Sequence, residues 1–311
     1  MRVLVVASFN KSRFAPFIVE QVEALKKQGC TIDFFGLQGK GLLGYLKNLP
    51  LLKQKINEFC PDVIHAHYGL SGLFANLQRR VPIVTTYHGS DINDKKVLRF
   101  SKVAMRLSAW NVFVSRKILE IASPKKKYKL LPCGIDLSDL QLTKKGEARR
   151  KMNLQANEKY ILFAGAFDVE VKNAPLAKEA VALLQDDQTK LLELKGYTRE
   201  EVTLLMCAAD AFLLTSFMEG SPQVIKEAMA CGCPIVSVDV GDVRERMAGV
   251  EGCYVANTRK PEELAGLLRK ALSFEGRTKG RDKTIADGID NQQVAKQLIE
   301  IYERVLRSEN H

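Results

Sequence analysis

The stretch Thr215–Pro234, TSFMEGSPQVIKEAMACGCP, joins the end of one strand to a helix and to the start of the next strand. The run DAFLLTS predicts a buried strand, and the apolar spacing after Pro222 predicts a helix. Ser221 suits the N-cap of that helix, with the proline at its first position. Gly232 predicts the helix end, and PIVSVDV predicts the following strand. This strand, helix and strand form one repeat of a doubly wound parallel sheet.

Two carboxylates flank the predicted helix start. Glu219 falls in the loop at the carboxyl end of a strand, where open α/β sheets bind ligands, and Glu227 falls about two turns into the helix. The free N–H groups at a helix start favour an anion such as a diphosphate. A carboxylate accepts hydrogen bonds from two neighbouring sugar hydroxyls. The pair therefore indicates a ligand site, and the alternative is two glutamates that only face solvent.

The same alternation of strand and helix patterns runs through the whole chain. Strand-like runs in the first half are RVLVVAS, TIDFFGL, DVIHAH, PIVTTYH, NVFVS and KLLP, and those in the second half are YILFAGA, KLLELKG, DAFLLTS, PIVSVDV and CYVAN. A charged stretch without strands, residues 137–159, separates the two series. We therefore expect an α/β chain with two Rossmann-like domains, residues 1–150 and 151–290, and a last helix within residues 291–311.

Composition indicates an ordinary globular protein. The 311 residues are 46% hydrophobic, which is enough for two domains. No run approaches the ~20 apolar residues of a spanning helix, and the N-terminal run MRVLVVASF has no cleavage site of the signal-peptide kind, so we expect a cytoplasmic protein. Seven scattered cysteines make no disulfide framework, and Cys231 and Cys233 lack a second ligand pair for zinc.

Positive charge is concentrated in the first half of the chain. Residues 1–150 hold 26 lysines and arginines against 11 aspartates and glutamates, whereas the remainder holds 21 against 25. Such a field attracts polyanions or an anionic membrane surface. No nucleic-acid-binding signature accompanies the charge, so we expect no nucleic-acid partner, although a basic binding module remains an alternative. The amphipathic segment 42–59 predicts either a helix lying on a membrane or a helix packed on the sheet.

The sequence Thr215–Pro234 resembles the Glu-x7-Glu signature of the retaining glycosyltransferases of family GT4. The resemblance includes the flanking residues TS, EG and EAMACGCPIVS. The resemblance spans nearly the whole chain. It implies the GT-B fold, in which two Rossmann-like domains face each other across a cleft, the first on the acceptor side and the second binding the nucleotide sugar. The last helix then returns to the first domain. The resemblance also implies that Glu219 meets the donor sugar near the reacting centre and that Glu227 binds the ribose. Gly220 and Ser221, at the same helix start, are further candidates for donor binding.

The run ILFAGAFDVEVKN carries the predicted phosphate contacts. Gly165 ends a strand and Lys172 follows seven residues later, where a cation is well placed for a diphosphate. GT4 proteins usually have Gly-Arg and then Lys here, but this chain has Ala166 at the arginine position, so one expected cation is missing. A solvated loop lysine is the alternative for Lys172. Gly196 and Tyr197, in KLLELKGYTREEV, are predicted beside the nucleotide base, although a βα unit common in the family is absent before them.

The first domain supplies a second group of candidates. In TTYHGSD, His88 follows a strand and matches the GT4 histidine that contacts the donor sugar. The resemblance therefore makes His88 the second catalytic candidate beside Glu219. The alternative is a structural histidine whose hydrogen bonds are all made within the protein. His65 and His67 point to one side of a strand end, where hydrogen bonding is favoured over a metal pair. The first loop, SFNKSRFAPF, lacks the Gly-Gly pair of many GT4 members and offers Lys11 and Arg13 as acceptor-side contacts.

Together these residues predict a metal-independent retaining glycosyltransferase. The resemblance implies transfer of a hexose from a UDP or GDP sugar to the hydroxyl of a lipid-linked or saccharide acceptor, in capsule, exopolysaccharide or lipopolysaccharide synthesis. No Asp-x-Asp triplet occurs, so we expect no metal and no cofactor, with Lys172 and the helix start stabilising the diphosphate. A basic surface and a lipid-linked acceptor suggest a peripheral position on the inner face of the cell membrane. The alternatives are a GT-B sugar-nucleotide epimerase and a degenerate, non-catalytic nucleotide-binding member.

Overall fold

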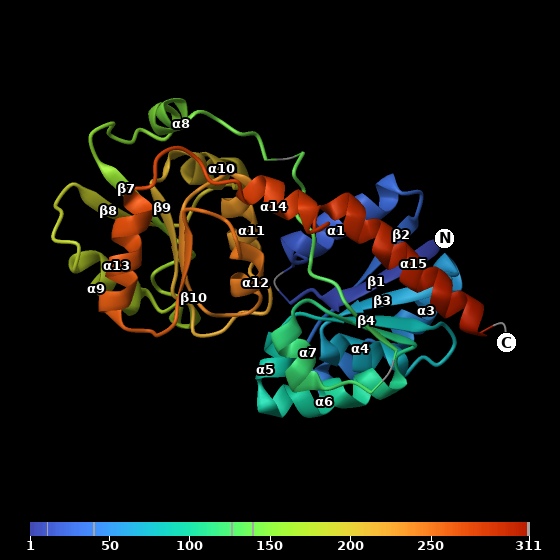
Figure 1. Ribbon diagram of the computed structural model, residues 1–311. Helices are drawn as coiled ribbons and strands as arrows, with labels where there is room; N and C mark the ends of the chain where they lie inside the picture. Colours follow the sequence, from blue (N-terminus) through green and yellow to red (C-terminus); the bar gives the residue numbers. More distant parts are fainter. Residues whose placement is uncertain (11, 40, 126, 139, 310–311) are drawn as a thin grey trace. The chain divides into compact units, whose positions relative to one another are not determined.

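The computed structural model describes residues 1–10, 12–39, 41–125, 127–138 and 140–309. The chain forms two compact units (Figure 1). The first comprises Met1–Gly134 together with the chain from Ile289 onward, and the second comprises Ile135–Gly288. Each contains one parallel sheet with helices on both faces, which confirms the predicted α/β class. Within the described ranges, no helix is both long enough and apolar enough to cross a bilayer.

The first unit is built on a six-stranded sheet in the order β2-β1-β3-β4-β5-β6, with every described pair of neighbours parallel. The strands are β1 (Arg2–Ser8), β2 (Thr31–Leu37), β3 (Val63–His67), β4 (Ile83–Tyr87), β5 (Trp110–Phe113) and β6 (Tyr128–Leu130). The helices are α1 (Pro16–Lys27), α2 (Gly41–Leu46), α3 (Leu49–Phe59), α4 (Gly69–Asn76), α5 (Ser90–Asn93), α6 (Lys95–Leu107), α7 (Arg116–Ala122) and α15 (Asn291–Glu309).

The two faces of this sheet carry separate cores. Successive side chains of a strand point to opposite faces, so Val3 and Val5 of β1 pack with α1 and α15, whereas Leu4 and Val6 pack with α3 and α4. The apolar stripe of α15 is almost fully buried in the first of these cores and comprises Val294, Leu298, Ile301, Tyr302 and Val305. The chain end thus completes the first unit.

The segment 42–59, for which a membrane helix and a packed helix were both predicted, forms most of α2 and the whole of α3. Pro50 lies in the first turn of α3, where its missing N–H costs nothing. Leu52 and Ile56 of α3 are 0% and 4% exposed and belong to the core. The structure therefore supports the packed-helix interpretation for α3.

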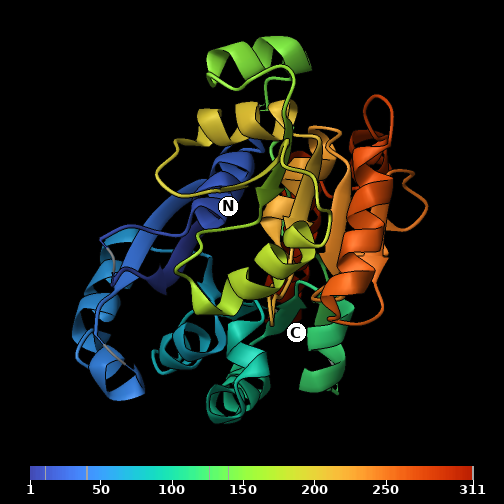
Figure 2. The same cartoon turned by 90° about the vertical axis from the view of Figure 1, so that its left-hand side faces the viewer.

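The second unit has a five-stranded parallel sheet in the order β11-β10-β9-β7-β8. The strands are β7 (Lys159–Phe163), β8 (Thr189–Glu193), β9 (Ala211–Leu214), β10 (Ile235–Val238) and β11 (Cys253–Ala256). The helices are α8 (Lys145–Lys151), α9 (Ala174–Ala182), α10 (Arg199–Ala208), α11 (Gln223–Ala230), α12 (Val243–Met247), α13 (Pro261–Leu272) and α14 (Gly280–Ala286), with a 3₁₀ turn η1 (Glu170–Lys172). Helix α8, green at the top of Figure 2, packs on α10.

The strand order of the second sheet reverses direction at β7. From β7 the chain moves to β8 on one side and then returns to β9 on the other side. The loops that follow β7 and β9 therefore diverge at the carboxyl ends of two neighbouring strands. Open α/β sheets bind their ligands at such a switch point.

Candidate functional site

An ion pair lies at the switch point of the second sheet. Lys172, at the end of η1 after β7, donates from Nζ to Oε1 of Glu219, in the loop after β9, over 2.7 Å. The two side chains are only 23% and 17% exposed. The structure thus brings together the predicted phosphate-binding lysine and the predicted sugar-binding glutamate, which are 47 residues apart in sequence.

The two loops that carry this pair are tied to each other. Thr215 Oγ1 donates to the carbonyl oxygens of Lys172 and Asn173, both over 2.9 Å. The backbone N–H of Phe217 donates to the carbonyl of Val171, also over 2.9 Å. Thr215 is fully buried, so its hydroxyl is committed to these contacts. The position of the ion pair is therefore set by the backbone of both loops.

Arg259 braces the second of these loops and was not among the predicted residues. It follows β11, and its guanidinium donates to the carbonyls of Thr215, Ser216 and Phe217 over 3.2, 2.9 and 3.1 Å. Its sequence signal is weak: a cation soon after the strand run CYVAN, at another carboxyl strand end. Because its described hydrogen bonds all go to backbone carbonyls, Arg259 positions the loop that carries the glutamate of the ion pair.

The close approach of the Lys172 side chain explains why a glycine, Gly165, follows β7. A Cβ built at this position would come within 2.9 Å of Cγ of Lys172, so the lysine stem crosses directly over the glycine backbone. The Gly165 carbonyl accepts from the N–H of Leu194 over 2.7 Å, which ties the loop after β7 to the chain leaving β8. In that chain Gly196 has a φ of +84°, a conformation that favours glycine, and Tyr197 is 41% exposed.

The start of α11 differs from the prediction. The helix begins at Gln223, with Pro222 in extended conformation as its cap residue, and Ser221 makes no capping hydrogen bond. The Ser221 hydroxyl instead donates to Oδ2 of Asp242 over 2.8 Å. Asp242 is 4% exposed, and a buried carboxylate requires donors more strongly than an exposed helix end does. The predicted N-cap role of Ser221 is therefore wrong, and Glu227 is the fifth residue of α11, one residue nearer to the helix start than predicted.

Glu227 faces the chain that follows β8. Its Oε1 lies 3.6 Å from Nη2 of Arg199, and the Glu227 side chain is 19% exposed. Arg199 is the first residue of α10, two residues after Tyr197, and a capping box between Thr198 and Glu201 fixes that helix start. The candidate ribose ligand and the candidate base neighbours therefore lie on adjoining elements.

Buried polar side chains, Lys226 of α11 and Asp242 of the loop after β10, lie beside the start of α11. Lys226 is fully buried and donates to Oε1 of Gln223 over 2.8 Å. Burial raises the pKa of Asp242, against the attraction of Lys226 and the Ser221 hydrogen bond. A Cβ at Gly241, whose φ is +54°, would lie 2.6 Å from the carbonyl oxygen of Gly220. The loops after β9 and β10 thus meet backbone to backbone, which places Gly220 at a fixed position.

In the first unit, neighbouring side chains hold His88 in place. His67 Nδ1 lies 3.0 Å from His88 Nε2, and Cys133 Sγ lies 3.6 Å from His88 Nδ1. The N–H groups of His88 and Gly89 both donate to Oδ1 of Asp91, over 3.0 and 2.9 Å. Burial raises the pKa of Asp91 to about 6, against these hydrogen bonds. His88 is half-buried after β4, and its predicted contact with a donor sugar stays a prediction.

The histidines of β3 form a buried stack. His65 and His67 lie on the same side of the strand with ring centroids 4.4 Å apart, as their spacing predicted. His65 contacts Thr86 Oγ1 over 2.7 Å and the Tyr302 hydroxyl of α15 over 2.6 Å. Burial lowers the pKa of His65 to about 3 and that of His67 well below its usual range, so both rings are neutral. His65 thus connects the chain end to the sheet.

The loop after β1 is fixed at one point. The Asn10 side chain donates to the carbonyl of Gly39 and accepts from its N–H, both over 2.8 Å. Arg13 is exposed in the same loop, and Lys11 lies outside the described residues. Among the described residues, there is no group of three or more histidine, cysteine, aspartate or glutamate side chains that could hold a metal ion.

Comparison with known proteins decides the family. The model for "Glycosyltransferase Family 4" matches residues 15–139, and that for "Glycosyl transferases group 1" matches residues 187–273. The chain belongs to glycosyltransferase family 4.

Family members with named roles show the same relationship. The chain is 30% identical over 256 residues to TuaC of Bacillus subtilis, named as a teichuronic acid biosynthesis glycosyltransferase, covering 73% of this chain and 64% of TuaC. It is 25% identical over 295 residues to the amylovoran biosynthesis glycosyltransferase AmsK of Erwinia amylovora, covering 79% and 71%. The chain therefore spans less than two thirds of the length of TuaC.

Solved structures show the fold of this GT4 chain. Sucrose-phosphate synthase of Thermosynechococcus elongatus superposes with a TM-score of 0.83 at 18% identity, covering 99% of this chain and 100% of that one. Anabaena HepE, solved in complex with UDP, superposes with a TM-score of 0.72 at 17% identity, covering all of both chains. The expected GT-B fold is confirmed.

Proposed function

We propose that this chain is a retaining glycosyltransferase of polysaccharide biosynthesis, which moves a hexose from a nucleotide diphosphate sugar to an acceptor hydroxyl. The observation that carries the proposal is the contact between Lys172 and Glu219 at the switch point of the second sheet. A cation for the diphosphate and a carboxylate for the sugar are adjacent there. They are held by two loops whose backbones are bonded together.

The geometry suggests how a donor would be held. A diphosphate that contacts Lys172 competes with Glu219 for the ammonium group, and the released carboxylate can then accept hydrogen bonds from sugar hydroxyls. In this proposal Glu227, in the second turn of α11, binds the ribose, and the N–H groups at the start of that helix add to the positive potential. The leaving diphosphate is stabilised by these fixed charges and dipoles, and the proposal assigns no step to a metal ion or cofactor.

The comparisons support a nucleotide donor and a polysaccharide product. TuaC and AmsK are named for the biosynthesis of teichuronic acid and amylovoran, and the HepE structures contain UDP and UDP-glucose. We therefore prefer a UDP sugar over a GDP sugar, with a saccharide or lipid-linked acceptor. A cytoplasmic protein at the inner face of the membrane fits such an acceptor. The epimerase alternative is not favoured, because the curated relatives named above are glycosyltransferases.

Two measurements test the proposal. Thermal unfolding with UDP, GDP, ADP and their sugars should show stabilisation by one base class, since a ligand of the native state raises the melting temperature. Incubation with the matching sugar nucleotide and an oligosaccharide acceptor should then give a product that retains the anomeric configuration, with or without EDTA. Incubation with the donor alone separates epimerisation from transfer. No thermal shift with any nucleotide, or unchanged transfer by Glu219→Ala, would refute the assignment.

A further inference from the structure

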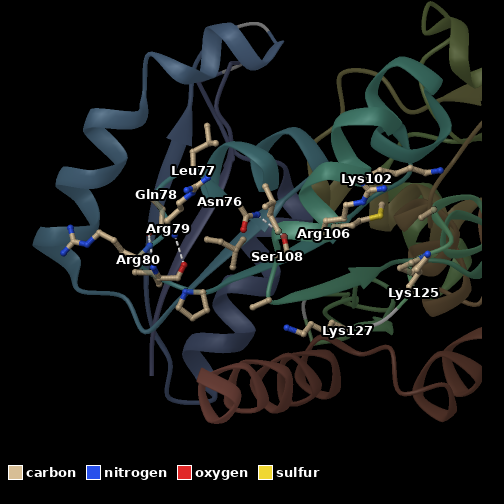
Figure 3. Close-up of a pocket in the computed structure, with 18 of the residues that line it drawn as sticks. Asn76, Leu77, Gln78, Arg79, Arg80, Lys102, Arg106, Ser108, Lys125 and Lys127 are labelled. Atoms are coloured by element: carbon tan, nitrogen blue, oxygen red, sulfur yellow. Dashed lines mark hydrogen bonds between the residues drawn. The ribbon is translucent and has the colours of Figure 1, made fainter. Parts of the chain in front are cut away.

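A strongly cationic pocket lies in the first unit, at the amino ends of β4, β5 and β6. It has a volume of about 1040 Å³ and is bounded by the C-terminal ends of α4, α6 and α7 (Figure 3). None of the described residues lining it is acidic. Its six cationic side chains are all exposed and comprise Arg79, Arg80, Lys102, Arg106, Lys125 and Lys127. The pocket lies at the opposite edge of this sheet from His88 and Arg13, which follow the carboxyl ends of strands.

The charge of this pocket is not neutralised by the protein. Arg80 donates to the side chain of Asn57 over 2.7 Å. Among the residues that the structure describes, the other five cationic side chains have neither an ion pair nor a hydrogen bond. Cations near helix C-termini complement the helix dipole, but here none reaches a terminal carbonyl as a capping side chain does. The positive potential therefore remains available to an external anion.

The wall that carries Arg79 has a fixed shape. Arg79 has a φ of +56°, which is uncommon for a residue with a side chain. Buried Gln78 holds this turn, since its side chain donates to the carbonyl of Val81 over 2.6 Å and accepts from the N–H of Arg80 over 2.8 Å. The two arginines are thus presented by a braced turn.

Helix α6 extends the pocket into a mixed surface. Its sequence KKVLRFSKVAMRL contains five cations and no carboxylate. Cationic side chains follow one exposed stripe at helical spacing, comprising Lys95, Arg99, Lys102 and Arg106. Apolar side chains follow the neighbouring stripe, comprising Phe100, Val103 and Leu107, which are 39%, 42% and 51% exposed. Ile121 of α7, next to a residue that lines the pocket, is 48% exposed.

The opposite side of α6 is seated firmly in the unit. A Cβ at Gly69 of α4 would lie 1.9 Å from Oγ of Ser101, so the two helices meet at van der Waals contact. The Ser101 hydroxyl donates to the carbonyl of Asp91 over 2.8 Å, and Asp94 caps the helix by accepting from Lys96 N–H. The exposed stripes are therefore held in a fixed orientation.

We propose that this pocket and the outer face of α6 dock the protein on an anionic phospholipid membrane. Phospholipid headgroups match the six cations, and the apolar stripe matches the boundary between headgroups and acyl chains. A soluble polyanion would use only the cations and would leave the apolar stripe in water. The inference rests on the proposed function, since the membrane is where a lipid-linked acceptor lies.

Vesicle co-sedimentation tests this surface. The protein should bind vesicles in which about one third of the phosphatidylcholine is replaced by phosphatidylglycerol, and not pure phosphatidylcholine vesicles. A cation at an anionic surface contributes roughly fivefold to partitioning, so Lys102→Glu with Arg106→Glu should lower binding by about 30-fold or more. Val103→Ser with Leu107→Ser should also weaken vesicle binding, while binding to soluble dextran sulfate should stay unchanged.

A matched control uses the other amphipathic segment. Lys47 and Lys53 are exposed, have no described partner and lie in or beside α2 and α3, so Lys47→Glu with Lys53→Glu makes the same charge change at residues that do not line the pocket. Binding by this control should change by less than about threefold, since a diffuse net charge contributes little.

Three results would overturn the proposal: no binding to the anionic vesicles, an equal loss in the control, or vesicle binding that is insensitive to the serine variant. Thermal shifts with UDP separate the two hypotheses. A variant that loses vesicle binding but keeps its UDP shift has lost the docking surface alone. An unmodified protein that binds vesicles but shows no nucleotide shift contradicts the proposed function and leaves the docking surface standing.

Discussion

Glu219→Gln should have opposite effects on nucleotide binding and on sugar transfer. Glu219 contacts Lys172 over 2.7 Å, and both side chains are largely buried at 17% and 23% exposure. A nucleoside diphosphate that binds Lys172 must compete with this carboxylate. The intact sugar nucleotide, by contrast, needs the carboxylate for its hexose. The same substitution therefore removes a competitor of one ligand and a contact of the other.

The size of each effect follows from the contact. A partly exposed ion pair contributes up to about 1 kcal/mol net. Removal of this ion pair should tighten UDP binding by up to about fivefold, because Lys172 no longer has to leave Glu219 in order to bind the diphosphate. Transfer should fall by roughly 100-fold or more, since a carboxylate that assists charge development is replaced by a neutral amide.

Isothermal titration with UDP and a product assay with the sugar nucleotide measure the two effects on one preparation. Glu227→Gln is the matched control, because it makes the same chemical change on α11. It should weaken UDP binding by roughly 10-fold, the value of a charge-assisted hydrogen bond to the ribose. Weaker UDP binding by Glu219→Gln, or transfer at the original rate, would refute the roles assigned to the pair.

Three further predictions concern stability, each measured by denaturant unfolding. Tyr302→Phe should cost about 1–3 kcal/mol, because it leaves the buried His65 Nδ1 without a partner; no loss would show that this contact does not hold α15. Below pH 6.5 the unfolded chain binds a proton at His65, whereas the folded chain, in which burial lowers the pKa of His65 to about 3, does not. The free energy of unfolding of the unmodified protein, relative to that of His65→Asn, should therefore fall by about 1.4 kcal/mol per pH unit as the pH is lowered. A difference that does not change with pH would contradict a neutral His65 ring. Gly69→Ala should destabilise the protein by about 1–3 kcal/mol, because the added Cβ clashes with Ser101. Gly266→Ala is the control: its Cβ meets open space, so it should stabilise the protein by about 0.5–1 kcal/mol. Equal effects of the two substitutions would contradict the close packing of α4 and α6.

The fold could be read from the sequence because both sheets are parallel. Parallel strands are covered on both faces, so they appear as continuous apolar runs, and each run predicted as a strand corresponds to one in the structure. The exact start of α11 could not be read. The preference of Ser221 for the N-cap is worth about 1 kcal/mol, and a buried acceptor from a later loop, Asp242, outweighs it. Local sequence around Ser221 contains no trace of that partner.

The residues of the candidate site could be named one by one from the sequence, but the contact between them could not be predicted. The motifs singled out Lys172 and Glu219 separately, and their contact depends on β9 returning beside β7, which no local pattern specifies. Arg259 was missed because it acts through backbone carbonyls of another loop. The cationic pocket likewise draws on the ends of three helices, whereas the sequence showed only that the first half is basic.

The topology explains why positive charge can gather at one edge of the first sheet without disturbing the other. In a parallel sheet the connecting helices all end at the amino edge of the strands, so the C-termini of α4, α6 and α7 converge beside the pocket. The negative ends of their dipoles lower the cost of placing cations together there. At the carboxyl edge, His67 and His88 are packed against neighbouring side chains, and burial keeps the His67 ring neutral. Charge reversal at the pocket and substitutions at the carboxyl edge should therefore act independently, because they alter opposite ends of the same strands.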